Sequence, residues 1–392
     1  MLVRSLVEYK LIPLYIFTVV RGFSVASFMF LYPLYLLSIN YSTPDIGLMT
    51  TLGSLPIPLI VPLIGYMVDR GWSRELLFLS NFLLGIAFIL PVIYPFYPVL
   101  ALAYTMLYLS MFMWMQSRTK LIAFIVSTSI LGRVYAVFSI LFNGSRTVTP
   151  FILSRLTEPY GYSFLMLVSG SITLALSIAI YLQLLAILHE IKRINTDLRH
   201  ALKGYISIFS SINHRDLPLI LFAGIDGFAW RLWFPLINAY LKQYRGLTDL
   251  DLGNYLTILS ISMLITAYLA GSITDRIKPL KALIIYELLG VTGVVALQFN
   301  EPILYLSPIL FGFSIAFWIT AYNSLLTILY GYHSIGRIRA LTDTMRSTVG
   351  IPAPQVGGYL LTINPLLTFI LSASLMLSAI TPLIMIKKEE LT

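Results

Sequence analysis

Long apolar stretches separated by short polar segments follow one another along the whole chain of 392 residues. An α-helix needs about 20 apolar residues to cross a bilayer. The pattern predicts six such helices near residues 11–37, 46–68, 75–94, 97–116, 134–156 and 161–187. Six more are predicted near residues 217–241, 252–273, 280–298, 302–325, 340–362 and 365–386. We therefore expect an all-α membrane protein of 12 transmembrane helices, with an N-terminal six-helix bundle (1–188), a central cytoplasmic loop (189–216) and a C-terminal six-helix bundle (217–392).

The composition supports a multi-pass integral protein of the cell membrane. Hydrophobic residues make up 58% of the chain and charged residues 11%, whereas a soluble protein has about twice that charged fraction. The sequence contains no cysteine. This excludes a disulfide framework, a thiolate metal site and a cysteine nucleophile.

The formal charge of +9 is unevenly distributed. If both termini are cytoplasmic, nearly all basic loop residues face the cytoplasm, and the outer loops hold only Arg155, Lys242 and Arg245. This asymmetry is the one that the positive-inside rule describes. We therefore expect both termini inside, with the basic segments facing the anionic head groups of the lipid bilayer rather than a nucleic acid.

The two halves of the sequence resemble each other. The triplet Arg21-Gly22-Phe23 matches Asp226-Gly227-Phe228, about 205 residues later. Further matches at a similar offset are Asp69-Arg70 with Asp275-Arg276 and Gly132-Arg133 with Gly336-Arg337. An internal repeat of this size predicts two pseudo-symmetric bundles and is typical of transporters.

The loop after the second predicted helix carries a family resemblance. It reads Gly65-Tyr66-Met67-Val68-Asp69-Arg70-Gly71-Trp72-Ser73-Arg74. This resembles the major facilitator superfamily signature Gly-x-x-x-Asp-Arg-x-Gly-Arg-Lys, and a weaker copy runs from Gly271 to Lys281. The chain departs from the signature at Trp72 and Ser73. The resemblance covers essentially the whole length and implies a transporter that works by alternating access.

In this family the loop motif resembles a brace of the cytoplasmic gate. The resemblance implies gating roles for Asp69 and Arg70, with Arg337 or Arg339 as partners of Asp69. In the second half of the repeat, Asp275 corresponds to Asp69 and Arg276 corresponds to Arg70. The resemblance implies that Arg133 is the partner of Asp275. The alternative is a set of solvated loop charges that only fix topology, because exposed ion pairs contribute roughly 0 to 1 kcal/mol.

Arg21 lies within the first apolar stretch and has no charged neighbour for ten residues on either side. A cation in hydrocarbon costs roughly 2.5 to 3.5 kcal/mol on insertion scales, so it normally faces a partner or a watery cavity. Helical spacing places Phe28 and Tyr32 on the same face as Arg21. We interpret this face as part of a binding site; the alternative is a packed stripe with a snorkelling arginine.

Asp226 occupies the position of Arg21 in the second half. Trp230 shares its helical face, whereas Arg231 lies about 140° away. We expect Arg21 and Asp226 to pair across the halves and Asp226 to act as the proton-coupling group, since burial and a charged partner both tune a carboxylate. A structural salt bridge is the alternative.

The complete predicted substrate site extends this set with residues of the fifth and seventh helices: Arg21, Phe28, Tyr32, Asn143, Arg146, Trp230, Arg231 and Asn238. Asp343 and Arg346 are three residues apart near the cytoplasmic end of the eleventh predicted helix. They could pair with each other or snorkel in a structural role, or they could take part in function. Glycines and prolines in the second predicted helix, and in the eleventh around Pro352, predict bending of both.

Three intramembrane arginines against one acid favour an anionic solute, because arginine offers a two-pronged donor to such groups. Arginines on the first and seventh helices resemble those of the family's organic-phosphate and organic-anion carriers. We expect a monomeric, proton-coupled symporter of a small organic solute. The alternative is proton-linked efflux of amphipathic compounds, although Thr149-Pro150 stands where such antiporters carry Gly-Pro. The four histidines have no metal-ligand spacing, so no enzyme activity, cofactor or metal site is predicted.

Overall fold

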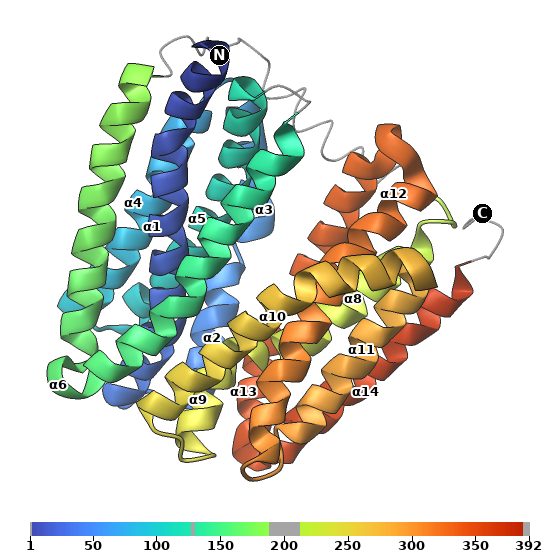
Figure 1. Ribbon diagram of the computed structural model, residues 1–392. Helices are drawn as coiled ribbons and strands as arrows, with labels where there is room; N and C mark the ends of the chain where they lie inside the picture. Colours follow the sequence, from blue (N-terminus) through green and yellow to red (C-terminus); the bar gives the residue numbers. More distant parts are fainter. Residues whose placement is uncertain (1, 127–129, 188–211, 387–392) are drawn as a thin grey trace. The chain divides into compact units, whose positions relative to one another are not determined.

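The computed structural model describes residues 2–126, 130–187 and 212–386. Within these ranges every regular element is helical, as predicted (Figure 1). The chain divides into two compact units. The first contains residues 1–40 and 52–205, and the second contains residues 41–51 and 206–392.

The first unit is a bundle in which α1 packs along α6, and α4 packs against α5 and α6 (Figure 1). Its helices are α1 (Leu2–Ser38), α3 (Ile57–Asp69), α4 (Ser73–Ile93), α5 (Tyr97–Ile125) and α6 (Leu131–Ile187). The 57 residues of α6 would measure about 85 Å as one straight helix, far beyond a bilayer core. Gly161 interrupts it with φ 74°, and this turn separates the two helices predicted there.

The second unit has α12 at its centre, in contact with α8, α10 and α11, while α14 covers α8 and α11. Its helices are α8 (Leu217–Arg231), α9 (Ile237–Gln243), α10 (Asp249–Ile277), α11 (Pro279–Ala296), α12 (Leu306–Val349), α13 (Ala353–Ile363) and α14 (Pro365–Met385). Two short 3₁₀ turns, η1 (Phe234–Leu236) and η2 (Ile303–Tyr305), lie between them. The first turns of α2 (Thr43–Ser54) also belong to this unit.

Prolines determine where the long spans break. The second predicted helix is divided at Pro56 into α2 and α3, which are bent by 42°, and this confirms the predicted bend. The eleventh is interrupted between α12 and α13 at Pro352, and its bending stays a prediction. The seventh predicted helix, 217–241, is not continuous, contrary to our expectation. It stops at Arg231 and resumes at Ile237, because Pro235 has no N–H to continue the hydrogen-bond ladder.

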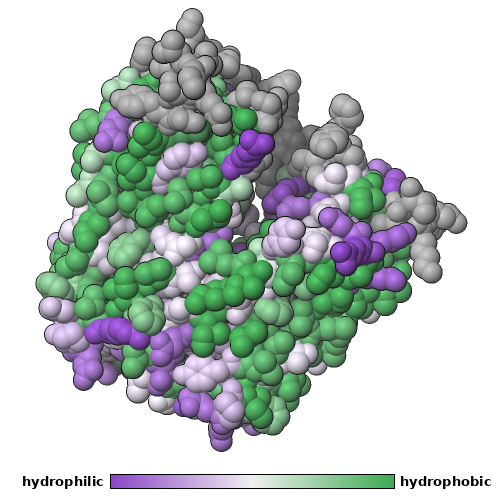
Figure 2. Space-filling view, viewed as in Figure 1, coloured by the Kyte–Doolittle hydropathy of each residue, from purple (hydrophilic) through white to green (hydrophobic). Residues whose placement is uncertain are grey.

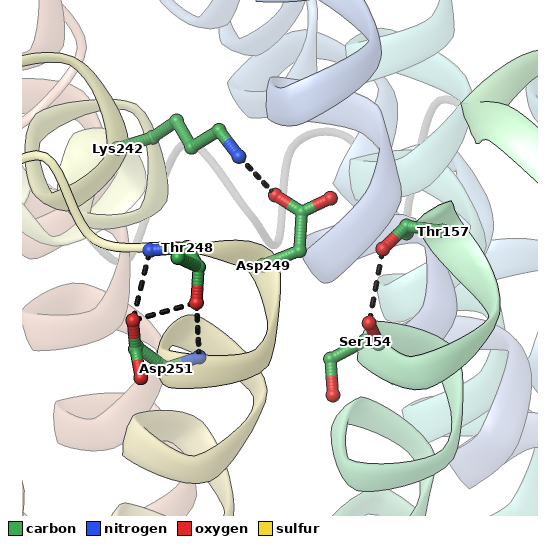
Figure 3. A network of polar contacts seen from close by, with 6 residues as sticks. All are labelled: Ser154, Thr157, Lys242, Thr248, Asp249 and Asp251. Atoms are coloured by element: carbon green, nitrogen blue, oxygen red, sulfur yellow. Dashed lines mark hydrogen bonds and ion pairs between the residues drawn. The ribbon is translucent and has the colours of Figure 1, made fainter. Parts of the chain in front are cut away.

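The basic residues of the predicted outer loops are held by local contacts. Arg155 donates to the carbonyl of Phe151. Lys242 forms an ion pair with Asp249 at the start of α10, and Thr248 and Asp251 form a capping box there (Figure 3). Reciprocal bonds of this kind satisfy the free N–H groups of a helix start.

Apolar side chains cover much of the molecular face that Figure 2 shows. Leu59 is 81% exposed and Tyr268 is 84% exposed, as lipid contact allows. The described part of the chain has nine helices long and apolar enough to cross a membrane, or ten if α2 and α3 form one span. The chain is therefore a multi-pass membrane protein. The count of twelve, the cytoplasmic termini and the domain boundaries stay predictions, and residues 188–211 of the central loop lie outside the described residues.

The predicted orientation can be tested with single cysteines, since the natural chain has none. Tyr160, beside the turn in α6, is 55% exposed, and His214 is exposed before α8. In intact cells we expect a membrane-impermeant maleimide to label Tyr160→Cys. His214→Cys should react only after permeabilisation. The reverse labelling would contradict the positive-inside assignment.

Candidate functional site

Arg21 is fully buried in the first unit. Its guanidinium donates to the Ser80 carbonyl oxygen at 3.3 Å, to Asn81 Oδ1 at 3.2 Å and to Ser110 Oγ at 2.9 Å. It also lies 5.8 Å from the centre of the Trp114 ring. None of these partners is a carboxylate. The two Nη atoms are therefore bound by neutral groups of α4 and α5, whereas the buried Nε has no hydrogen-bond partner among the described residues.

Asp226 is fully buried in the second unit. Arg346 Nη2 lies 3.0 Å from its Oδ2, and the Tyr286 hydroxyl donates to its Oδ1. The carboxyl of Glu287, next to Tyr286 on α11, interacts with Asp226 as well and is itself fully buried. Residues of α8, α11 and α12 thus form one polar cluster.

The two clusters occupy corresponding positions of the repeat. Five pairs of residues, 204 to 206 positions apart, match: Arg21 with Asp226, Asn81 with Glu287, Ser110 with Ser314, Trp114 with Trp318, and Phe142 with Arg346. The Phe142 ring stacks on Trp114 with centroids 4.6 Å apart. The Arg346 guanidinium lies 4.2 Å above Trp318. The scaffold is shared, but the charge is inverted.

Glycine at matching positions makes both clusters possible. A Cβ on Gly22 would come within 2.5 Å of the Phe142 carbonyl oxygen. A Cβ on Gly227 would lie 2.6 Å from the Arg346 carbonyl oxygen and 2.5 Å from its Cγ. Any larger residue would separate α8 from α12 and pull Arg346 away from Asp226.

Aromatic rings surround the Asp226 cluster. Trp230 stacks on Tyr286 with centroids 5.9 Å apart and planes 10° apart, and Phe311 lies edge-on against Trp230. The Trp233 ring packs against both, with its centroid 4.6 Å from that of Phe311 and 5.4 Å from that of Trp230. This wall keeps the surroundings of the carboxylate apolar, which strengthens its interaction with Arg346.

The predicted aromatic residues of helix α1 lie inside the first unit. Phe28 and Tyr32 have ring centroids 4.5 Å apart, and Phe28 also packs edge-on against Phe88. The Tyr32 hydroxyl donates to the Leu100 carbonyl oxygen at 2.7 Å. Both side chains are buried by α4 and α5, and their role in substrate binding stays a prediction.

The other predicted binding residues are less enclosed or lie elsewhere. Asn143 donates to Ser139 Oγ at 3.2 Å, and part-buried Arg146 lies 5.4 Å from the Phe142 ring centre. Arg231 donates to the Ser347 carbonyl oxygen at 3.0 Å, away from Asp226 as its helical angle predicted. Asn238 is buried in α9.

The predicted pairing of Arg21 with Asp226 stays a prediction, because each has its described partners within its own unit. The count of three arginines against one acid needs correction. Glu287 is a second buried acid, and Arg346 is the partner of Asp226. Asp343 pairs with Arg339 at 3.6 Å rather than with Arg346.

The predicted gating residues lie near helix ends. Asp69 is 3.9 Å from Lys120, and both side chains are more than half exposed; the Arg70 guanidinium lies over Tyr66. Arg133, Asp275 and Arg276 are exposed. Asp275 also lines a cavity of about 510 Å³ between α10, α11 and α12. The Arg337 side chain lies outside the described residues, and the gating roles stay predictions.

Residues of α13 pack closely on the start of α2. This helix belongs to the eleventh predicted span, for which a bending gate helix was expected. A Cβ on Gly47 would lie 2.4 Å from the Pro354 carbonyl oxygen. A Cβ on Gly358 would lie 2.9 Å from Pro44 Cα. The Gln355 backbone N–H also donates to Thr51 Oγ1 at 3.2 Å.

The fold and the two polar clusters define a membrane transporter built from repeated helical bundles. The sequence model of the Major Facilitator Superfamily matches residues 14–354, and the chain belongs to this family. It is therefore a secondary transporter of small molecules rather than a member of an enzyme family. A comparison with curated proteins finds no match.

Solved transporter structures share the fold. The nucleoside transporter NupG superposes with a TM-score of 0.75 at 11% identity, over 97% of this chain and 99% of that chain. A bacterial homologue of the human lysosomal transporter Spinster, inward-facing and unoccupied, has a TM-score of 0.68 at 11% identity, over 97% and 95%. At this identity the likeness concerns the fold alone.

The close approach of α8 and α12 predicts the effect of a single methyl group. Gly227→Ala forces a Cβ against the Arg346 backbone and should destabilise the protein by about 1 to 3 kcal/mol. Gly224→Ala, one turn earlier on α8, is the matched control, because its Cβ would lie 3.6 Å from the nearest atom, Val349 Cγ2. We expect thermal unfolding in detergent to show a lower Tm for Gly227→Ala alone. Equal Tm values would contradict the packing argument.

Proposed function

We propose that the protein couples the transport of a small organic anion to protons by alternating access, with the proton exchanged at the carboxylate site around Asp226. The observation that supports this most is the fully buried carboxylate of Asp226, which lies 3.0 Å from the part-buried guanidinium of Arg346. Ionisable groups inside a membrane are costly and are typical of substrate and proton pathways. Because the second carboxyl of Glu287 joins this pair, the cluster has more acids than cations, which is a suitable composition for binding a proton.

An anionic solute is supported by the charge of the first unit. Arg21 is buried among neutral acceptors and has no carboxylate among its described partners. A guanidinium in such surroundings attracts an anion that can take two of its N–H donors. The solute would thus balance the positive charge of the Arg21 cluster when alternating access brings the two into contact.

Proton-linked efflux of amphipathic compounds is the second candidate. The aromatic wall of Trp230, Trp233 and Phe311 offers surfaces on which lipophilic cations stack. The fold neighbour NupG is described as a nucleoside transporter, so nucleosides form a third, uncharged class to be tested. Neither a lipophilic cation nor a nucleoside needs the positive charge of Arg21 for recognition. Dependence of transport on Arg21 therefore distinguishes an anionic solute from these two classes.

The test is reconstitution in liposomes with a trapped pH dye and panels of organic anions, lipophilic cations and nucleosides. We expect luminal acidification with anions only. Arg21→Ala should lose it because the anion loses its counter-charge, and Asp226→Asn should lose it because the proton site loses its carboxylate.

Arg155→Gln is the matched control, since the contacts described for this exposed arginine are with Phe151 of its own helix. Its activity should equal that of the unchanged protein. Proton movement with cations alone would favour efflux, and a response to nucleosides alone would reject the anionic solute. Full activity of Asp226→Asn would reject the proton site.

A further inference from the structure

Glu287 is a fully buried acid in the middle of α11, a helix that packs against α8, α12 and α14. The titratable groups that act on it are Asp226 from α8, Arg346 from α12 and its neighbour Tyr286. The cluster therefore contains two acids and one permanent cation. In an apolar interior a second negative charge without a counter-charge is strongly disfavoured. One of the two carboxyls must hold a proton.

The hydrogen bonds distinguish the two carboxyls. Asp226 receives the Tyr286 hydroxyl proton on Oδ1 and faces the Arg346 guanidinium with Oδ2. This environment suits a carboxylate, because Oδ1 accepts a hydrogen bond and Oδ2, which accepts none in the structure, forms an ion pair with a cation. Among the described residues, no N–H or O–H donates to either oxygen of Glu287. Its carboxyl interacts with Arg346 and with Asp226. Because Asp226 is an acceptor, a hydrogen bond between the two carboxyls requires a proton on Glu287.

The repeat supports a neutral side chain at this position. Asn81, the counterpart of Glu287 in the first unit, contacts Arg21, the counterpart of Asp226. A neutral amide therefore fills the same place in the shared scaffold. A protonated carboxyl has a similar shape and polarity, with one donor and one acceptor in place of the amide.

We propose that Glu287 is a protonated carboxylic acid that donates to ionised Asp226, and that it holds the single proton of this cluster. The location of the proton on Glu287 is independent of the proposed function. That this proton is the one transported rests on the proposed proton coupling. In that step the O–H bond of Glu287 breaks, its electron pair stays on the Glu287 oxygen, and the proton passes to water. Asp226 keeps its negative charge throughout and positions Arg346.

Infrared spectroscopy of the intact protein in lipid tests the location of the proton without any transported solute. A protonated carboxyl has a carbonyl stretch that is separate from those of carboxylates. In the unchanged protein at neutral pH we expect one such band, shifted by ¹³C-labelled glutamate and unaffected by ¹³C-labelled aspartate. A shift with aspartate instead, or no band, would overturn the proposal, and no variant needs to fold for this result.

Variants then count the protons. Glu287→Gln and Asp226→Asn each leave one acid for Arg346, so the band should disappear in both. Arg346→Gln leaves two acids and no cation, so a second band, sensitive to labelled aspartate, should appear. Glu75→Gln is the matched control, because Glu75 already pairs with Arg74 at 2.9 Å, and its spectrum should keep the single band. One band in all variants would overturn the assignment.

The transported proton is tested in the pH-dye liposomes with the organic-anion panel. Glu287→Gln should lose proton movement, whereas Glu287→Asp, which keeps an ionisable carboxyl, should retain part of it. Undiminished proton movement in Glu287→Gln would overturn the second part of the proposal. If the unchanged protein moves no protons, the proposed function fails, while the infrared result on Glu287 still stands.

Discussion

Balancing buried charge is the constraint on which both polar clusters depend. Water does not stabilise an ion in the bilayer core, so each ionised side chain needs donors, acceptors or a counter-charge from neighbouring helices. Arg21 finds three neutral acceptors on α4 and α5. Asp226 finds a cation on α12 and a hydroxyl on α11. The same position of the repeat thus carries opposite charges in the two units, and each charge is stabilised by a different set of neighbouring groups.

These contacts depend on helices that approach more closely than ordinary side chains allow. Gly22 and Gly227 correspond in the repeat, and each lies directly against a backbone carbonyl of the facing helix. Small residues permit such crossings in membrane proteins, where no hydrophobic force pulls helices together. The facing residues, Phe142 and Arg346, also correspond, and each contacts a tryptophan of its own unit. Packing and electrostatics are therefore repeated together.

The sequence could predict the elements of this arrangement but not its partners. Hydropathy, the repeat and the loop motif were sufficient for the fold class and the family, and isolated charges in apolar stretches identified Arg21 and Asp226. Helical periodicity describes one helix at a time, so it could not join Arg346 to Asp226 across two helices. Glu287 was overlooked, although the repeat offset that aligns it with Asn81 was available. A search for polar residues at matching offsets would have found it.

The inverted charges suggest how a pseudo-symmetric transporter divides two tasks. In the function proposed above, the cation of one unit attracts an anion, whereas the two acids that share one cation in the other unit bind a proton. The proposal thus assigns the proton and the anion to separate sites within one repeated scaffold. Each cluster is held by contacts within its own unit. In this proposal, coupling arises from how alternating access exposes the two clusters.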